Sequence, residues 1–71
     1  MIVEYLLIPG IVGDHGVQVI RAGLGALPGV LLVTISLVGK RVRVEHTGRT
    51  NVEELIGAIN QAGYDQVAVL A

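Results

Sequence analysis

Six short segments, separated by glycine and proline, limit this chain to a small number of folds. Four of them are apolar runs of strand length, and two repeat apolar residues every three or four positions, which is the spacing of one buried helix face. The predicted strands are residues 2–8, 30–38, 41–45 and 66–70, and the helical repeats are Val17, Ile20, Leu24 and Leu27, then Val52, Leu55, Ile56 and Ile59. The predicted order of elements is therefore βαββαβ.

The starts and ends of the two predicted helices carry capping residues. Asp14 is predicted to cap the first helix, because its carboxylate can accept hydrogen bonds from the free amides of the first turn. Thr50 and Glu53 have the spacing of a capping box at the start of the second helix. Gly63 stands where a glycine commonly ends a helix.

This order of elements predicts an α+β, ferredoxin-like sandwich that occupies residues 1–71 as a single domain. Right-handed crossovers place the first strand beside the third, which gives a four-stranded antiparallel sheet of order 4-1-3-2 with two helices on one face. In that topology the first turn, the Gly39-Lys40 turn and the Gly63-Tyr64 loop meet at one end of the molecule. His46 and the two chain termini lie at the other end.

The composition favours an apolar core and argues against several classes of function. Hydrophobic residues make up 52% of the chain and cysteine is absent, so the core has neither a disulfide nor a thiolate metal site to support it. Five basic and six acidic residues give a net charge of -1, which provides no field for nucleic acid. The apolar N-terminal run is too short to insert into a membrane. We therefore expect a cytoplasmic protein, or a cytoplasmic domain of a longer one, that binds no nucleic acid.

The turn after the first predicted strand gathers the residues that could carry chemistry. It contains Gly10, Gly13 and Gly16 together with Asp14 and His15. A carboxylate and an imidazole suit Zn, Ni or Co better than Cu(I). Zinc sites normally use three or four protein ligands, so Asp14 and His15 alone make a weak metal site.

No other predicted feature completes a cofactor or catalytic site at this turn. His46 is predicted to be an exposed strand-end residue about 16 Å away, which is too far to act as a third ligand. The three glycines do not have the spacing of a dinucleotide-binding loop, and Asp14 would repel a phosphate. With no activated nucleophile or poised base in the sequence, we expect neither a bound cofactor nor an enzyme.

Several segments of the chain resemble a known family. Gly10-Ile11, Leu27-Pro28-Gly29-Val30, Glu53-Glu54-Leu55-Ile56 and Ala62-Gly63-Tyr64 are similar to the matching segments of heavy-metal-associated (HMA) domains, which occur in copper chaperones and metal-pumping P-type ATPases. The resemblance covers nearly the whole chain. It implies the same βαββαβ fold and a place in metal transport.

The family's metal motif, Gly-Met-x-Cys-x-x-Cys, differs here at its functional positions. Its two cysteines fall on Gly13 and Gly16, and its methionine falls on Ile11, which keeps a buried apolar residue. Tyr64 matches the family's loop tyrosine near the metal and is expected to shape that end. The resemblance therefore implies the fold, whereas soft-metal binding is expected to be weak or lost.

A basic cluster and the uncovered face of the sheet are the candidate docking features. Lys40, Arg41 and Arg43 form the only basic cluster in the sequence, at the hairpin between the second and third strands. Charges of this kind mainly raise the rate of association with a partner. Leu6 and Ile8 are predicted to form an apolar patch on the uncovered face, which would favour contact with another protein.

Together these features predict a non-enzymatic, copper-chaperone-like HMA domain that acts by docking or regulation. Its expected partner is a protein, either a related HMA domain or a second copy of the chain. One alternative is a metal-free interaction or oligomerisation module that uses the uncovered sheet face. Another is a small-molecule-binding regulatory domain, since Asp14-His15-Gly16-Val17 also resembles the first turn of ACT domains.

Overall fold

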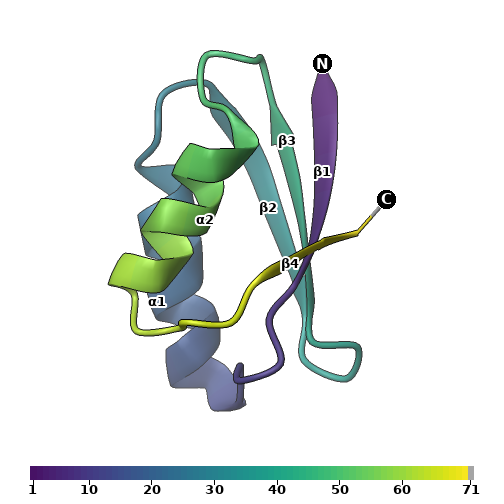
Figure 1. Ribbon diagram of the computed structural model, residues 1–71, viewed down its shortest axis with the longest axis vertical. Coiled ribbons are helices and arrows are strands. Elements are labelled where there is room, and N and C mark those ends of the chain that lie inside the picture. Colours follow the sequence, from purple (N-terminus) through teal and green to yellow (C-terminus); the bar gives the residue numbers. More distant parts are fainter. Residues whose placement is uncertain (71) are drawn as a thin grey trace.

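All six predicted elements are present in the computed structural model, which describes residues 1–70 (Figure 1). The strands are β1 (Ile2–Leu7), β2 (Val30–Ser36), β3 (Arg41–His46) and β4 (Ala68–Leu70), and the helices are α1 (Gly13–Gly25) and α2 (Val52–Gln61). Residue 71, which the predicted domain includes, lies outside the described residues. β2 ends two residues earlier than predicted, because a turn closes there with Lys40 N donating to Leu37 O at 3.3 Å.

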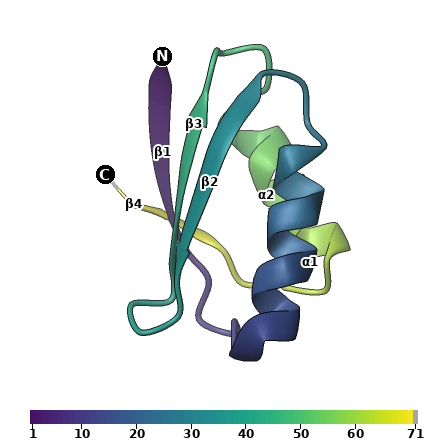
Figure 2. The same ribbon diagram turned by 180° about the vertical axis from the view of Figure 1, so that it is seen from behind.

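The strands form one antiparallel sheet in the order β2-β3-β1-β4, which confirms the predicted topology. Both helices pack on the same face of this sheet and leave the other face uncovered (Figures 1 and 2). β4 pairs only with the C-terminal half of β1, from Tyr5 to Leu7. Neither helix in residues 1–70 is long and apolar enough to cross a membrane.

The core lies between the helices and the covered face of the sheet. Leu24 of α1 and Leu55 of α2 are fully buried against Val42 and Val44 of β3. The remaining buried apolar side chains are Leu6, Ile8, Ile11, Ile20, Val33 and Ile59. The predicted face of α1 is confirmed, and on α2 Val52, Leu55 and Ile59 are buried or packed against this core, whereas Ile56 is only partly buried and lies outside it.

The direction predicted for the side chains of β1 was wrong. Leu6 and Ile8 are fully buried on the covered side of the sheet, whereas Tyr5 is 45% exposed on the uncovered side. The register explains this result, because Leu6 lies opposite the buried Val42 and Tyr5 lies opposite Arg43. The uncovered face therefore carries the alternate side chains of β1, such as Tyr5, instead of the predicted patch of Leu6 and Ile8.

The start of α1 also differs from the prediction. The helix begins at Gly13, and its N-cap residue is Val12, which makes no side-chain capping hydrogen bond. Gly13 has a φ of 69°, and the helix begins two residues earlier than a cap at Asp14 would allow. Asp14 is therefore not the cap but lies inside the first turn, where its charge still interacts favourably with the helix dipole.

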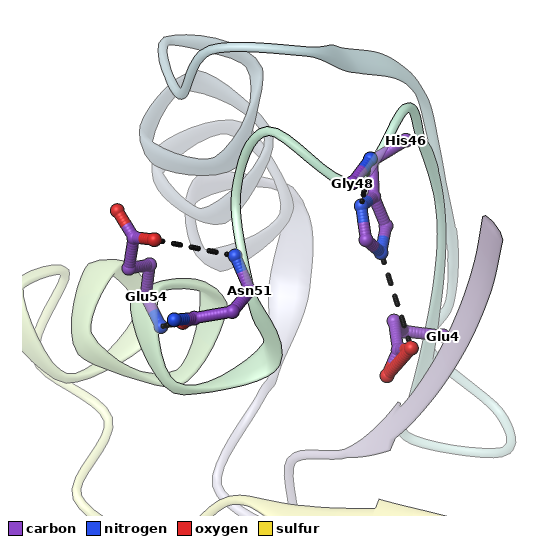
Figure 3. A network of polar contacts seen from close by, with 5 residues as sticks. All are labelled: Glu4, His46, Gly48, Asn51 and Glu54. Atoms are coloured by element: carbon purple, nitrogen blue, oxygen red, sulfur yellow. Dashed lines mark hydrogen bonds and ion pairs between the residues drawn. The ribbon is translucent and has the colours of Figure 1, made fainter. Parts of the chain in front are cut away.

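The capping box of α2 lies one residue later than predicted. Asn51 Oδ1 accepts from Glu54 N at 2.9 Å, and Glu54 Oε1 accepts from Asn51 N at 3.2 Å (Figure 3). Thr50 is fully buried instead, and its hydroxyl donates to Pro28 O at 2.5 Å. Thr50 thus joins the start of α2 to the end of the α1–β2 connection, and Gly63 follows the end of α2 with the expected positive φ of 107°.

Candidate functional site

The β1–α1 loop is held in place by the β2–β3 hairpin. Ile8 N donates to Lys40 O at 2.8 Å, and Lys40 Nζ donates to Ile11 O at 2.7 Å. Ile11 is fully buried, so its side chain attaches the loop to the core while its carbonyl binds the hairpin through Lys40. Lys40 is therefore part of the loop structure, whereas it was predicted to belong with Arg41 and Arg43.

The two glycines at the family's cysteine positions have different surroundings. Gly13 is exposed, and a Cβ atom at this position would meet no atom within 4 Å. Gly16 is buried in the first turn of α1, and a Cβ atom there would lie 2.5 Å from Tyr64 Oη and 3.4 Å from Ile11 Cγ1. The space that a side chain at residue 16 would need is therefore occupied by the tyrosine hydroxyl.

Tyr64 lies across the glycines of the loop. Its ring edge, at Cδ1, is 3.6 Å from the position of a Cβ atom on Gly10, and its hydroxyl reaches Gly16. The segment that carries it is fixed by α2, because Asn60 Nδ2 donates to Tyr64 O at 2.7 Å. Tyr64 thus closes the loop at the place where the family resemblance puts a metal ion.

Asp14 and His15 have no third candidate metal ligand beside them in the described chain. Both are exposed in the first turn of α1. Within residues 1–70 no three His, Cys, Asp or Glu side chains come together in an arrangement that could hold a metal ion. The arrangement thus supplies two adjacent ligands at most, fewer than a zinc site normally uses.

His46 was predicted to be exposed, and this was wrong. Its exposed fraction is 3%, because it continues the alternation of Val42 and Val44 and faces the covered side of the sheet. Nδ1 accepts from Gly48 N at 3.1 Å, and Nε2 faces Glu4 Oε1 at 3.9 Å without a hydrogen bond (Figure 3). His46 belongs to the packing at the far end of the sheet from the loop.

The uncovered face of the sheet carries Arg41 and Arg43, the other two residues of the predicted basic cluster. Arg43 stacks over the ring of Tyr5, with its guanidinium carbon 5.9 Å from the ring centre, and its Nε donates to Tyr5 Oη at 3.3 Å. Hydrogen bonds to Tyr5 and Glu45 raise the pKa of Arg43 above its ordinary value, so the side chain stays charged. Arg41 is exposed on the same face.

Comparison with known proteins places the chain in a family. Residues 6–65 match the family model of the heavy-metal-associated domain. The chain belongs to the HMA family. A search of the curated proteins found no match.

Solved structures share the fold of this HMA domain. The yeast copper transporter domain Ccc2a has a TM-score of 0.90 and 25% identity, over 97% of this chain and 94% of that chain. Apo-CopP from Helicobacter pylori has a TM-score of 0.85 and 25% identity, over 94% of this chain and all of that chain. A chain of the Atx1–Cu(I)–Ccc2a complex has a TM-score of 0.86 and 23% identity, over 97% and 94% of the two chains.

The HMA fold thus brings together only some of the residues that the sequence singled out. Gly10, Gly16 and Tyr64 meet at the loop, and Lys40 supports it from the hairpin. The contact between Lys40 Nζ and the Ile11 carbonyl was missed, because no sequence pattern reports a hydrogen bond to a backbone carbonyl 29 residues away. The burial of His46 could have been found, since the alternation that buries Val42 and Val44 extends to residue 46.

Proposed function

We propose that this HMA domain is a docking or regulatory module of a metal-homeostasis system and does not carry a soft metal ion on its loop. The observation that carries the proposal is the position of Tyr64 Oη, which fills the volume of a side chain at Gly16. The sequence has no cysteine at position 16, and the hydroxyl of Tyr64 also occupies the space that a cysteine side chain would need there. The proposed module is not an enzyme, and its proposed location is the cytoplasm.

A metal titration followed by two-dimensional amide NMR tests the metal part of this proposal. We expect Cu(I), Zn(II), Ni(II) and Co(II), added under reducing conditions, to cause no saturable shifts in residues 10–17 or 63–65. The matched control is the triple variant Gly13→Cys, Gly16→Cys and Tyr64→Ala, which restores two soft ligands and removes the ring above them. This variant is expected to bind Cu(I), because thiolates select that ion. Gly13→Cys is strained by the φ of 69° at that position, so the amide NMR spectrum of the variant is first used to check that it is folded.

A different outcome of the titration would contradict the proposal. Saturable shifts around Asp14 and His15 that disappear in His15→Ala would instead support a site for Zn, Ni or Co in the first turn of α1. Such a site needs further ligands from solvent or from a second chain, because the two residues supply too few. Shifts at His46 alone would indicate binding outside the loop.

The docking part of the proposal rests on the uncovered sheet face. Arg41 and Arg43 lie there beside the exposed ring of Tyr5, and Glu45 on the same face pairs with Arg43, so Arg41 supplies the unpaired positive charge next to apolar surface. A partner that presents carboxylates around an apolar centre would complement this face. A related HMA domain is a reasonable class of partner, since one structural neighbour comes from a complex named for Atx1 and Ccc2a.

The docking surface can be tested with the HMA domain of a P-type ATPase as the binding probe. Arg41→Glu and Arg43→Glu are expected to weaken binding by about tenfold or more, because they place like charges opposite one another. Arg49→Glu is the matched control, since Arg49 is exposed in the β3–α2 connection, away from the uncovered face. Equal weakening by all three variants, or binding that ignores salt concentration, would argue against this surface.

A further inference from the structure

The outer edge of β2 has no strand partner within residues 1–70. β2 is the end strand of the sheet and pairs only with β3, so the backbone groups on its outer side face away from the sheet. None of its seven residues is charged or proline, although such residues usually protect an exposed edge from pairing. An irregularity between Val30 and Leu32 disturbs only its start, which leaves residues 32–36 as a regular edge.

A stripe of exposed residues on α1 runs beside this edge. Asp14, Gln18, Arg21 and Gly25 recur every three or four positions and therefore share one side of the helix. All four are exposed, and Arg21 and Gly25 line a groove of about 260 Å³ together with residues 30–33 of β2. Figure 2 shows that α1 and β2 lie side by side, and we call the stripe together with the outer edge of β2 the β2 edge surface.

The charges of the stripe are complementary to those of a second, reversed copy. Asp14 and Arg21 are seven residues apart, so their midpoint lies beside Gln18. A two-fold axis at that midpoint brings Asp14 of one chain to the partner's Arg21, and the reverse pair forms at the same time. The only ion pairs within residues 1–70 are Arg43–Glu45 and His46–Glu4, so both stripe charges are available for such contacts.

The strand has a matching symmetry. Antiparallel pairing centred on Thr34 places it opposite the partner's Thr34, and it places Val33 opposite the partner's Ile35 in two equivalent pairs. Pairs of threonines and of β-branched residues across strands are favourable. α1 and β2 run in opposite directions (Figure 1), and Arg21 lines one groove with residues 30–33 of β2. A step along β2 toward Thr34 therefore leads back along α1 toward Gln18, so one axis serves both elements.

We propose that a second copy of this chain binds the β2 edge surface and forms a two-fold symmetric dimer with a sheet that continues across both chains. Leu31 and Leu32, at 60% and 52% exposure, supply apolar surface at this edge, and part of it is covered in this arrangement. The inference does not rest on the proposed function, because pairing at the β2 edge requires neither a particular state of the metal loop nor a partner on the uncovered face, although Asp14 also belongs to the loop and Thr34 lies opposite Arg43 in the sheet.

Sedimentation velocity across a range of concentrations, from about 10 μM to about 1 mM, tests this dimer. The weight-average mass is expected to rise from one chain to two. Thr34→Lys is expected to raise the dissociation constant by about tenfold or more, since it sets two positive charges against each other on the axis. Gln66→Lys, an exposed loop change outside the surface, is the matched control and is expected to leave the constant unchanged.

A charge exchange tests the geometry of the pair. Asp14→Arg alone is expected to weaken the dimer, and the double variant Asp14→Arg, Arg21→Asp is expected to restore it, because the two-fold pairing is kept with the signs reversed. An amide NMR spectrum of each variant checks that the chain is folded. A mass that stays at one chain at every concentration, or a double variant that does not recover, would overturn the proposal.

Discussion

The side chain that Gly16 lacks and the hydroxyl of Tyr64 would occupy the same volume. A Cβ atom at residue 16 would lie 2.5 Å from Tyr64 Oη, closer than real Cβ atoms approach a neighbour. Glycine inside a helix costs up to about 1 kcal/mol relative to alanine, so it needs a reason at this place. The reason is local, because the glycine makes room for the tyrosine that closes the loop.

This pairing predicts a coupling between residues 16 and 64. Gly16→Ala is expected to be more favourable in the Tyr64→Phe background than in the natural chain, by about 1 kcal/mol in the free energy of unfolding, because phenylalanine lacks the hydroxyl that the new methyl group meets. Urea unfolding of the four members of the cycle measures this term. Gly57→Ala is the control, since a Cβ atom there meets nothing within 4 Å. Additive effects of Gly16→Ala and Tyr64→Phe would contradict the contact.

A second prediction at this scale concerns the tautomer of His46. Gly48 N donates to Nδ1, so the neutral ring must carry its proton on Nε2, which faces Glu4. Long-range proton–nitrogen NMR at a pH where the ring is neutral is expected to show this tautomer. A proton on Nδ1 would contradict the hydrogen bond. The assigned tautomer leaves no lone pair on Nε2, so His46 is not expected to ligate zinc.

At the scale of elements, the sequence located each helix but misplaced the N-cap of α1 by two residues and that of α2 by one. Thr, Asn and Asp are all good capping residues, so a run such as Thr50-Asn51 offers two equivalent starts. The choice was made by packing, because Thr50 is needed to hold the Pro28 carbonyl and Asn51 is then left at the cap. Sequence alone does not contain the contact that separates the two.

The assigned cap predicts different costs for neighbouring substitutions. Asn51→Ala is expected to lower the free energy of unfolding by about 1 kcal/mol, since it leaves an amide of the first turn without its acceptor. Glu54→Ala removes the other half of the box, whereas Glu53→Ala removes neither and is the matched control. Urea unfolding measures all three. A larger loss for Glu53→Ala than for Glu54→Ala would favour the box predicted from the sequence.

For the whole molecule, the order of elements and the sheet topology followed from periodicity and from the handedness of crossovers, and both are confirmed. The face of β1 did not follow, because Leu6 and Leu7 are adjacent and either parity buries one leucine. The pairing of Leu6 with Val42 in the sheet decides between them. The nearness of Tyr64 to Gly10 was predictable, because it follows from the topology of the sheet and helices. The hydrogen bond from Lys40 Nζ to the Ile11 carbonyl was not, because it depends on a single contact.

The burial of Leu6 has a consequence for the stability of the whole chain. Leu6→Ala leaves a cavity in the core and is expected to cost about 2–5 kcal/mol, whereas Leu7→Ala, at a partly buried position on the other face, is expected to cost much less. Small domains have a total stability of about 5 kcal/mol or somewhat more, so the first change removes much of it and the second does not. Equilibrium unfolding in urea compares the two variants directly. If Leu7→Ala proved the more damaging, the helices would have to cover the opposite face of the sheet, and Arg41, Arg43 and Tyr5 would no longer be available for docking.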